Sequence, residues 1–221
     1  MQAHVSSWRQ RIVRRNLSQR MRVILAERYR RMVEQSDEYA LIKRSIDGDH
    51  DAFAQLMERY AGSVFNLAYR MLGNAQEAED ASQEIFLRAY TNLARFDQER
   101  RFSTWLLSIG SNYCIDRLRR RRFAWLTLDD VVLSVPTPAK GPERSAIERE
   151  EQDAVQRALL RLPPTYREVA VLRYWNDLSY EEIMQVTGLP ESTIKTRLHR
   201  ARRMLAVALR AEGVVQEEIP S

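Results

Sequence analysis

The sequence predicts an all-α protein in which two small helical domains are joined by an extended linker. Leucine, arginine, alanine and glutamate dominate its composition, and only 7 glycines and 7 prolines interrupt the 221 residues. Apolar residues recur at intervals of three and four over long stretches, which is the spacing of amphipathic helices. Residues 131–142 break this periodicity and hold three prolines within seven positions, so we expect the linker there.

The first predicted domain covers residues 36–122 and follows a basic extension over residues 1–35. Its apolar residues repeat at helical spacing. A loop over residues 95–102 precedes its last helix, which we expect Ser103 to cap. The expected helices cover residues 36–72, with a break at Asp47-Gly48-Asp49, residues 76–93 and residues 103–122.

The second predicted domain covers residues 148–211. It lies between the linker over residues 123–147 and a short tail over residues 212–221. The prolines of Leu162-Pro163-Pro164 are expected to separate an initial helix from a second helix over Thr165–Trp175. Two further helices are expected to complete this domain.

These last two helices, within residues 178–205, have the features of a helix-turn-helix. Gly188 stands where the first should end in a left-handed conformation, and Pro190 with Glu191 suits the start of the second. The second helix has an apolar face to pack on its domain and an opposite face of donors that could enter the major groove. The apolar face holds Ile194, Leu198, Ala201 and Leu205; the other holds Ser192, Lys195, Thr196, His199 and Arg203, with Arg200 at its margin. We therefore expect DNA binding; the alternative is an ordinary solvated surface.

The predicted helix over residues 103–122 carries a second face with DNA-binding chemistry. An aromatic ring can stack on an unpaired base, and arginines can follow the phosphates of a single strand. The face consists of Trp105, Ser108, Asn112, Asp116 and Arg119, and the helix ends in an arginine cluster that includes Arg120. The alternative is a polar helix face with Trp105 in the core.

The helix over residues 76–93 has the opposite charge. Its acidic face would repel DNA, so it favours a protein partner, although a solvated surface would give the same pattern. This face consists of Glu77, Glu79, Asp80, Gln83 and Glu84, beside Phe86.

Composition excludes several other classes of protein. The chain has no run of about 18 apolar residues, so we expect no membrane-spanning helix, and its basic N-terminus lacks the features of a signal peptide. The single cysteine, Cys114, rules out an internal disulfide and suits a reducing cytoplasm. The three histidines are far apart and no Cys/His cluster is present, so neither a metal nor another cofactor is expected.

The positive charge is concentrated at the N-terminus. Residues 1–31 hold nine arginines and one acid, Glu27, which gives this segment a charge of +8. The whole chain has a net charge of +5, so the remaining residues carry 5 − 8 = −3. This asymmetry favours a second partner besides DNA. We expect the segment to be a mobile tail or a frayed helix; alternatively, translation begins at Met21 or Met32.

Two sets of motifs resemble conserved regions of bacterial RNA polymerase sigma factors. Leu162-Pro163-Pro164, Arg167-Glu168 and the helix-turn-helix are similar to region 4. The short linker is typical of the extracytoplasmic-function (ECF) subgroup of the sigma-70 family, and the resemblance covers about residues 36–209. The motifs similar to region 2 are Asp49 with Ala52-Phe53, Glu79-Asp80-Ala81-Ser82-Gln83-Glu84-Ile85-Phe86, Phe102-Ser103-Thr104-Trp105-Leu106, and Ile115-Asp116 with Leu118-Arg119-Arg120.

The resemblance implies a subunit that binds core RNA polymerase, recognises the −10 and −35 promoter elements and opens DNA, with no catalytic residues of its own. Its partners would be the clamp helices of the β′ subunit, the β subunit, promoter DNA and, as in many family members, an anti-sigma factor. The β′ contact maps to Asp80, Gln83, Glu84 and Phe86, and the single-stranded −10 contact to Phe96, Trp105, Asn112, Asp116, Arg119 and Arg120.

The −35 contact implied by the resemblance lies on the second helix of the helix-turn-helix. Ser192 stands where the family often has glycine, so its hydroxyl could add a backbone contact. The bases would be read by Lys195, Thr196, His199 and Arg200, and the phosphates contacted by Arg197, Arg202 and Arg203.

Two other functions compete with this interpretation. A helix-turn-helix regulator that binds an operator would fit residues 178–205, but residues 36–122 show neither the strands nor the phosphoacceptor setting of a receiver domain. A nucleic-acid enzyme would need metal-binding carboxylates such as Asp129-Asp130 or Asp47 and Asp49. Acid pairs in these positions are more often helix caps and solvated turns.

Overall fold

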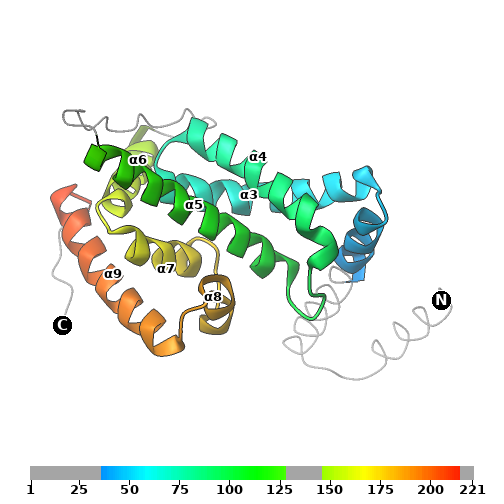
Figure 1. Ribbon diagram of the computed structural model, residues 1–221. Helices are drawn as coiled ribbons and strands as arrows, with labels where there is room; N and C mark the ends of the chain where they lie inside the picture. Colours follow the sequence, from blue (N-terminus) through cyan, green and yellow to red (C-terminus); the bar gives the residue numbers. More distant parts are fainter. Residues whose placement is uncertain (1–35, 128–145, 215–221) are drawn as a thin grey trace, which may run out of the picture. The chain divides into compact units, whose positions relative to one another are not determined.

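The computed structural model describes residues 36–127 and 146–214 (Figure 1). All regular elements within these ranges are helical, which confirms the predicted all-α class. None of the described helices is long and apolar enough to cross a membrane. After a helix over residues 36–46, the elements are α3 (His50–Leu72), α4 (Ala75–Asn92), a 3₁₀ turn η1 (Leu93–Arg95), α5 (Phe102–Thr127), α6 (Ala146–Leu160), α7 (Pro164–Tyr174), α8 (Tyr180–Thr187) and α9 (Glu191–Ala211).

The predicted basic extension and most of the predicted linker and tail lie outside the described residues. The chain divides into two compact units between Ala52 and Phe53. The domain limits expected from the sequence, at residues 36–122 and 148–211, stay predictions.

The predicted break at Asp47-Gly48-Asp49 is confirmed. Gly48 has a φ of +93°, a conformation that favours glycine, and the helix over residues 36–46 ends before it. Asp49 then accepts a hydrogen bond from the Ala52 amide at 3.0 Å, which caps the start of α3. Arg44 pairs with Asp49 at 2.6 Å, and these two contacts lower the pKa of the Asp49 carboxyl, the Ala52 bond being the larger cause.

Helices α3, α4 and α5 share one buried core. Leu67 and Met71 of α3, Ile85 of α4 and Leu106 of α5 are fully or almost fully buried. Gly110 allows α5 to approach closely, because a Cβ there would lie 2.9 Å from Leu67 Cδ2. Helical spacing therefore predicted these four buried positions correctly, whereas Met57, in the same apolar repeat, is exposed. The core fixes the rotation of α5 about its axis.

The limits of α5 differ from the prediction. The helix begins at Phe102 and continues through Thr127, instead of running from Ser103 to Arg122. Ser103 as the cap is wrong, because the amide of Trp105 already bonds to the Arg101 carbonyl at 3.1 Å and Ser103 lies inside the first turn. Phe102 is buried against Phe96 and Trp105, and this packing favours an earlier start than side-chain capping alone suggests.

The helix-turn-helix forms as predicted. Ser179 and Glu182 make a reciprocal capping box at the start of α8. Gly188 follows α8 with a φ of 69°, in the left-handed conformation, and Pro190 precedes the first residue of α9. The turn thus fixes the angle between the two helices.

Two of the C-terminal helices, α7 and α8, pack against α5 and lie beside it in Figure 1. Ser111 Oγ of α5 donates a 2.6 Å hydrogen bond to Glu168 Oε1 of α7, and both residues are buried. The adjacent Arg167 donates to the carbonyl oxygens of Met71, at the end of α3, and Leu162. Residues that the sequence places in two domains therefore share buried polar contacts in this structure.

Candidate nucleic-acid interface

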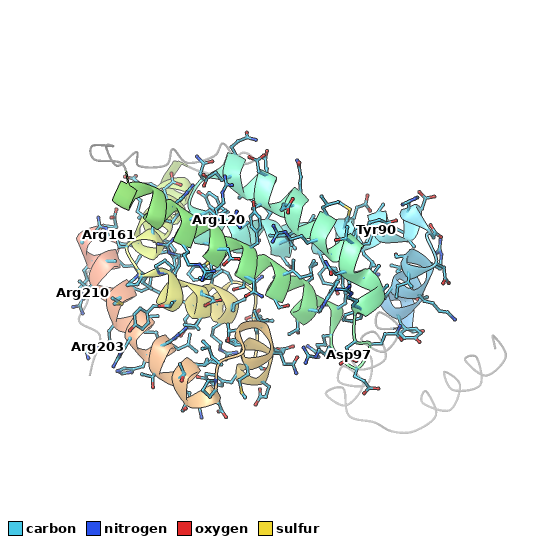
Figure 2. All side chains as sticks on the ribbon, in the orientation of Figure 1. Tyr90, Asp97, Arg120, Arg161, Arg203 and Arg210 are labelled. Atoms are coloured by element: carbon cyan, nitrogen blue, oxygen red, sulfur yellow. The ribbon has the colours of Figure 1, made fainter. Side chains whose placement is uncertain are left out.

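Helix α9 presents its basic and hydrogen-bonding face to solvent. Ile194, Leu198 and Ala201 on the other side are buried, so the helix is anchored with this face outward. Arg197 is half-buried. The remaining predicted DNA contacts on α9 are exposed: Ser192, Lys195, Thr196, His199, Arg200, Arg202 and Arg203. Figure 2 shows Arg203 and Arg210 projecting from α9.

Two cations on this face are oriented by neighbouring side chains. Lys195 Nζ lies 2.7 Å from Glu191 Oε1, one turn earlier, and 5.6 Å from the centroid of the Tyr180 ring. The hydrogen bond to Glu191 raises the pKa of Lys195, so its ammonium group stays charged. Arg200 Nη1 donates a 3.2 Å hydrogen bond to Tyr166 Oη on α7.

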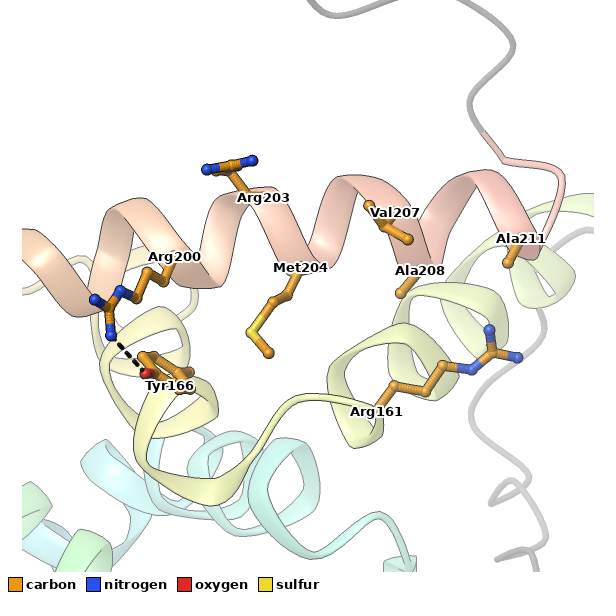
Figure 3. Close-up of a pocket in the computed structure, with 8 residues that line it drawn as sticks. All are labelled: Arg161, Tyr166, Arg200, Arg203, Met204, Val207, Ala208 and Ala211. Carbon is orange, nitrogen blue, oxygen red and sulfur yellow. Dashed lines mark hydrogen bonds between the residues drawn. The ribbon is translucent and has the colours of Figure 1, made fainter.

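Two hollows lie on either side of this Arg200–Tyr166 contact. The smaller, of about 280 Å³, opens among the predicted DNA contacts Ser192, Thr196 and Arg197. The larger, of about 520 Å³, lies between α9, α7 and the end of α6 (Figure 3). Its apolar lining is Met204, Val207, Ala208 and Ala211, and Arg161, Arg200 and Arg203 also line it. Met204 and Val207 in this lining are large apolar side chains that are exposed to solvent.

The predicted single-strand face of α5 reaches solvent. Asn112, Arg119 and Arg120 are exposed, and Figure 2 shows Arg120 on this helix. Asp116 is half-buried and pairs with Arg119, one turn further along. Amide, carboxylate and guanidinium groups are thus aligned on one stripe that could hydrogen-bond to unpaired bases and contact phosphates.

Trp105 and Phe96 lie together at the start of that stripe. Their ring centroids are 5.1 Å apart, and Phe102 packs against both rings. Trp105 is half-buried, whereas Phe96 is only 7% exposed. Phe96 therefore supports the Trp105 ring here, and its own contact with a base stays a prediction.

The acidic face of α4 is more divided than its sequence suggests. Asp80 and Gln83 are exposed, but Glu84 is paired with Arg88 at 2.7 Å and Phe86 is buried. Glu77 turns towards α5, where it pairs with Arg117 and Arg121. The exposed part of the face is therefore narrower than the predicted one.

Sequence reasoning missed Leu87 and Tyr166. Leu87 is 58% exposed and lies one turn after Gln83 and two turns after Asp80, so helical spacing could have placed it on the acidic face. Tyr166 is 34 residues from Arg200, and spacing along one helix cannot relate two residues on different helices. Only the packing of α7 on α9 brings them together.

Cys114 of α5 is a free, buried cysteine. Burial raises the pKa of the Cys114 thiol to about 12, so almost none of it is thiolate at neutral pH. Across residues 36–127 and 146–214, no group of three or more His, Cys, Asp or Glu could hold a metal ion.

Comparison with known protein families gives two matches along the chain. Residues 56–124 match sigma-70 region 2, and residues 152–205 match sigma-70 region 4. The first match contains α4 and most of α5, and the second contains the helix-turn-helix.

Individual proteins show similarity over most of the chain. The ECF RNA polymerase sigma factor SigW of Bacillus subtilis is 40% identical over 177 residues, which is 76% of this chain and 95% of SigW. The RNA polymerase sigma-H factor of Pseudomonas aeruginosa is 32% identical over 186 residues, covering 80% of this chain and 96% of that protein.

Two solved structures share the fold. CnrH, in complex with the cytosolic domain of CnrY, is 30% identical with a TM-score of 0.58, and covers 79% of this chain and 98% of its own. The sigma factor RpoE of Bartonella quintana, in complex with the anti-sigma factor NepR, is 23% identical with a TM-score of 0.63. That match covers 72% of this chain and 96% of RpoE. These similarities favour a polymerase subunit over the operator-binding regulator.

Proposed function

Because this chain belongs to the ECF group of the sigma-70 family of RNA polymerase sigma factors, we propose that α9 reads its −35 element and α5 holds its opened −10 element. The observation that carries this proposal is the exposed donor face of α9 on a buried apolar seam. A helix built in this way can lie in the major groove without losing its packing. The second surface, on α5, adds aromatic and amide groups suited to unpaired bases.

On the −35 duplex, Arg200 and Lys195 are the strongest candidates for base recognition. Both are exposed and charged, and both cations can donate to O6 and N7 of guanine. A good bidentate contact of this kind contributes about 1–3 kcal/mol of discrimination against a wrong base. Arg197, Arg202 and Arg203 flank them and would contact phosphates, which positions the helix without reading sequence.

At the −10 element, the stripe from Trp105 to Arg119 would stabilise the separated strand. Stacking of a base on an aromatic ring contributes about 1–3 kcal/mol. Each base-pair step that is opened loses about 1.4 kcal/mol of stacking. The two terms are of similar size, so a few held bases can balance the cost of a short opened segment.

Protein partners would use the remaining surfaces. Asp80, Gln83 and the exposed Leu87 on α4 offer an acidic rim with one apolar anchor for the polymerase β′ clamp helices. The apolar hollow on α9, with its arginines, suits an acidic amphipathic helix, such as one from the β subunit. An anti-sigma protein would compete for the same surfaces; RpoE, which shares the fold, forms a complex with the anti-sigma factor NepR.

The chain itself would carry out no catalysis. Polymerase supplies the active site, and this subunit supplies promoter recognition and strand opening in the cytoplasm, where the polymerase works.

Reconstituted transcription tests this proposal. The purified full-length chain, mixed with core polymerase, should bind it in a pull-down and should initiate from a subset of a promoter library with common −10 and −35 sequences. Retention of DNA binding with no binding to core polymerase would support an operator-binding regulator instead. The control is core polymerase alone, which should not select promoters.

A further inference from the structure

We propose that Tyr166 is a positioning residue that aims Arg200 at one base pair of the −35 element. This inference rests on the proposed function of α9, and it adds a specificity-determining residue outside the recognition helix. Tyr166 lies in the first turn of α7 and does not belong to the helix-turn-helix.

The Tyr166 ring is fixed by the core of the C-terminal helices. It packs against the buried cluster of Leu162, Ala170 and Ala201, which joins α7 to α9. Pro163 and Pro164, at the start of α7, restrict the backbone two and three residues before it. A ring held at its base places its hydroxyl at a defined point beside α9.

Arg200 meets that hydroxyl directly. Its Nη1 donates to Tyr166 Oη at 3.2 Å, and Figure 3 shows the guanidinium of Arg200 turned towards the tyrosine. A guanidinium has five N–H donors, so one bond to Tyr166 leaves enough donors for a bidentate contact with a guanine. The hydroxyl therefore orients the arginine without using up its capacity to read a base.

The position of this contact links it to DNA recognition. Tyr166 lines the smaller hollow together with Ser192, Thr196 and Arg197, so its hydroxyl lies among the predicted DNA contacts. Arg203, three residues further along α9, projects away from Tyr166 in Figure 3. Of these two exposed arginines on α9, Arg200 is therefore the one that Tyr166 orients.

Pre-orientation matters because an exposed arginine otherwise loses much rotamer freedom when it binds. Tyr166→Phe keeps the packed ring and removes only the acceptor. We expect this variant to weaken promoter binding about threefold to tenfold, the effect of one net hydrogen bond. We also expect it to relax base preference at the position that Arg200 reads.

The experiment uses holoenzyme assembled from the full-length chain and core polymerase. The probe is a promoter library in which the −35 base pairs are randomised, and the readouts are base preference at each position and affinity for the preferred promoter. Four proteins form a double-mutant cycle: wild type, Tyr166→Phe, Arg200→Ala and the double variant. Tyr174→Phe, at a 47% exposed tyrosine on the same helix, is the matched control and should behave as wild type.

The expected result is that Tyr166→Phe and Arg200→Ala relax preference at the same position, and that the double variant binds no more than about twofold more weakly than Arg200→Ala alone. Equal losses from Tyr166→Phe in both backgrounds, or an unchanged preference, would overturn the role of Tyr166 while leaving that of Arg200 intact. Unchanged preference in Arg200→Ala would overturn the proposed role of Arg200, and the inference with it. Equal thermal unfolding midpoints for all four proteins exclude a folding defect.

Discussion

Asn112 is the residue that best separates strand opening from duplex reading. It is exposed on α5, two turns after Trp105 and distant in sequence from α9. Asn112→Ala should therefore spare recognition of the −35 duplex by the holoenzyme but lower open-complex formation about threefold to tenfold, the effect of one or two lost hydrogen bonds. Permanganate reactivity of unpaired thymines measures the opening.

Asn66→Ala is the matched control for Asn112→Ala, since Asn66 is an exposed asparagine on α3. Promoter DNA with a pre-melted −10 segment should partly rescue Asn112→Ala. If this DNA gave no rescue, Asn112 would have no role in opening.

At the residue scale, the sequence predicted which side chains share a helix face, but not which of them touch another helix. Ile194, Leu198 and Ala201 are buried as their spacing predicted. The contacts of Arg200 with Tyr166, and of Ser111 with Glu168, join residues 34 and 57 positions apart. Such contacts depend on how helices pack, and periodicity within one helix carries no information on that.

At the scale of one element, α4 should be the dock for polymerase. Asp80 and Glu84 are one turn apart beside the exposed Leu87, so reversing both charges changes this face while keeping the helix. Asp80→Lys with Glu84→Lys should lower the affinity for core polymerase at least about tenfold, because like charges across an interface are costly. Pull-down or surface plasmon resonance with core polymerase measures it.

Glu58→Lys is the control, because it reverses a charge on the exposed side of α3. This variant should bind core polymerase with the affinity of the wild-type protein. Leu87→Ala should weaken binding without changing any charge. Wild-type affinity in the double reversal would contradict the docking role of α4.

The limits of the elements were predictable wherever the chain carries its own stop signal. Gly48 and Gly188 both have positive φ and both end helices where expected. The start of α5 was not predicted, because buried aromatic packing at Phe102 outweighs the cue of Ser103. The end of α5 was not predicted either, because the strong helix formers after Arg119 extend the helix. Local signals thus fail where tertiary contacts compete with them.

At the scale of the whole molecule, charge is unevenly divided, and residues 1–31, outside the described residues, carry +8. Such a segment should bind phosphates without reading sequence, and its contribution should fall steeply with salt. Deleting residues 1–31 should therefore lower promoter affinity mainly at low salt and leave promoter choice unchanged. Affinities of both proteins at several salt concentrations decide this; equal salt slopes would mean that these arginines do not contact DNA.

The packing of α5 against α7 and α8 has a consequence for promoter binding. The −10 and −35 elements are about 25 base pairs apart, which is about 85 Å of duplex at 3.4 Å per base pair. Helix α7 contacts both α5 and α9 and is only about 16 Å long at 1.5 Å per residue, so we do not expect one chain in this arrangement to span that distance. We therefore expect the buried contacts of Glu168 with Ser111, and of Arg167 with Met71, to break when the protein binds a promoter.

We expect Glu168 to make this opening dependent on pH. Burial raises the pKa of its carboxyl, more than the Ser111 hydrogen bond and the charge of Arg197 lower it, and the thiol of Cys114 also lies nearby. The packed form therefore binds the proton more tightly than the opened form. It should be most stable at low pH and should weaken as pH rises from about 4.5, the ordinary value for glutamate, through the raised pKa.

Two substitutions at Glu168 should act in opposite directions. Glu168→Gln keeps an acceptor for Ser111 and removes the buried charge, so it should hold the packed form at neutral pH and abolish the pH dependence. Glu168→Ala leaves the buried Ser111 hydroxyl without its acceptor and should favour opening. Energy transfer between dyes at Glu79→Cys and Arg210→Cys, in proteins that also carry Cys114→Ser so that no dye reacts at this position when the packed form opens, reports the separation from pH 5 to 8. The same transfer efficiency in all three proteins at every pH would show that Glu168 does not control the opening. Slower holoenzyme formation by Glu168→Gln alone would instead connect this buried carboxyl to the step at which α5 and α7 separate as the protein binds polymerase.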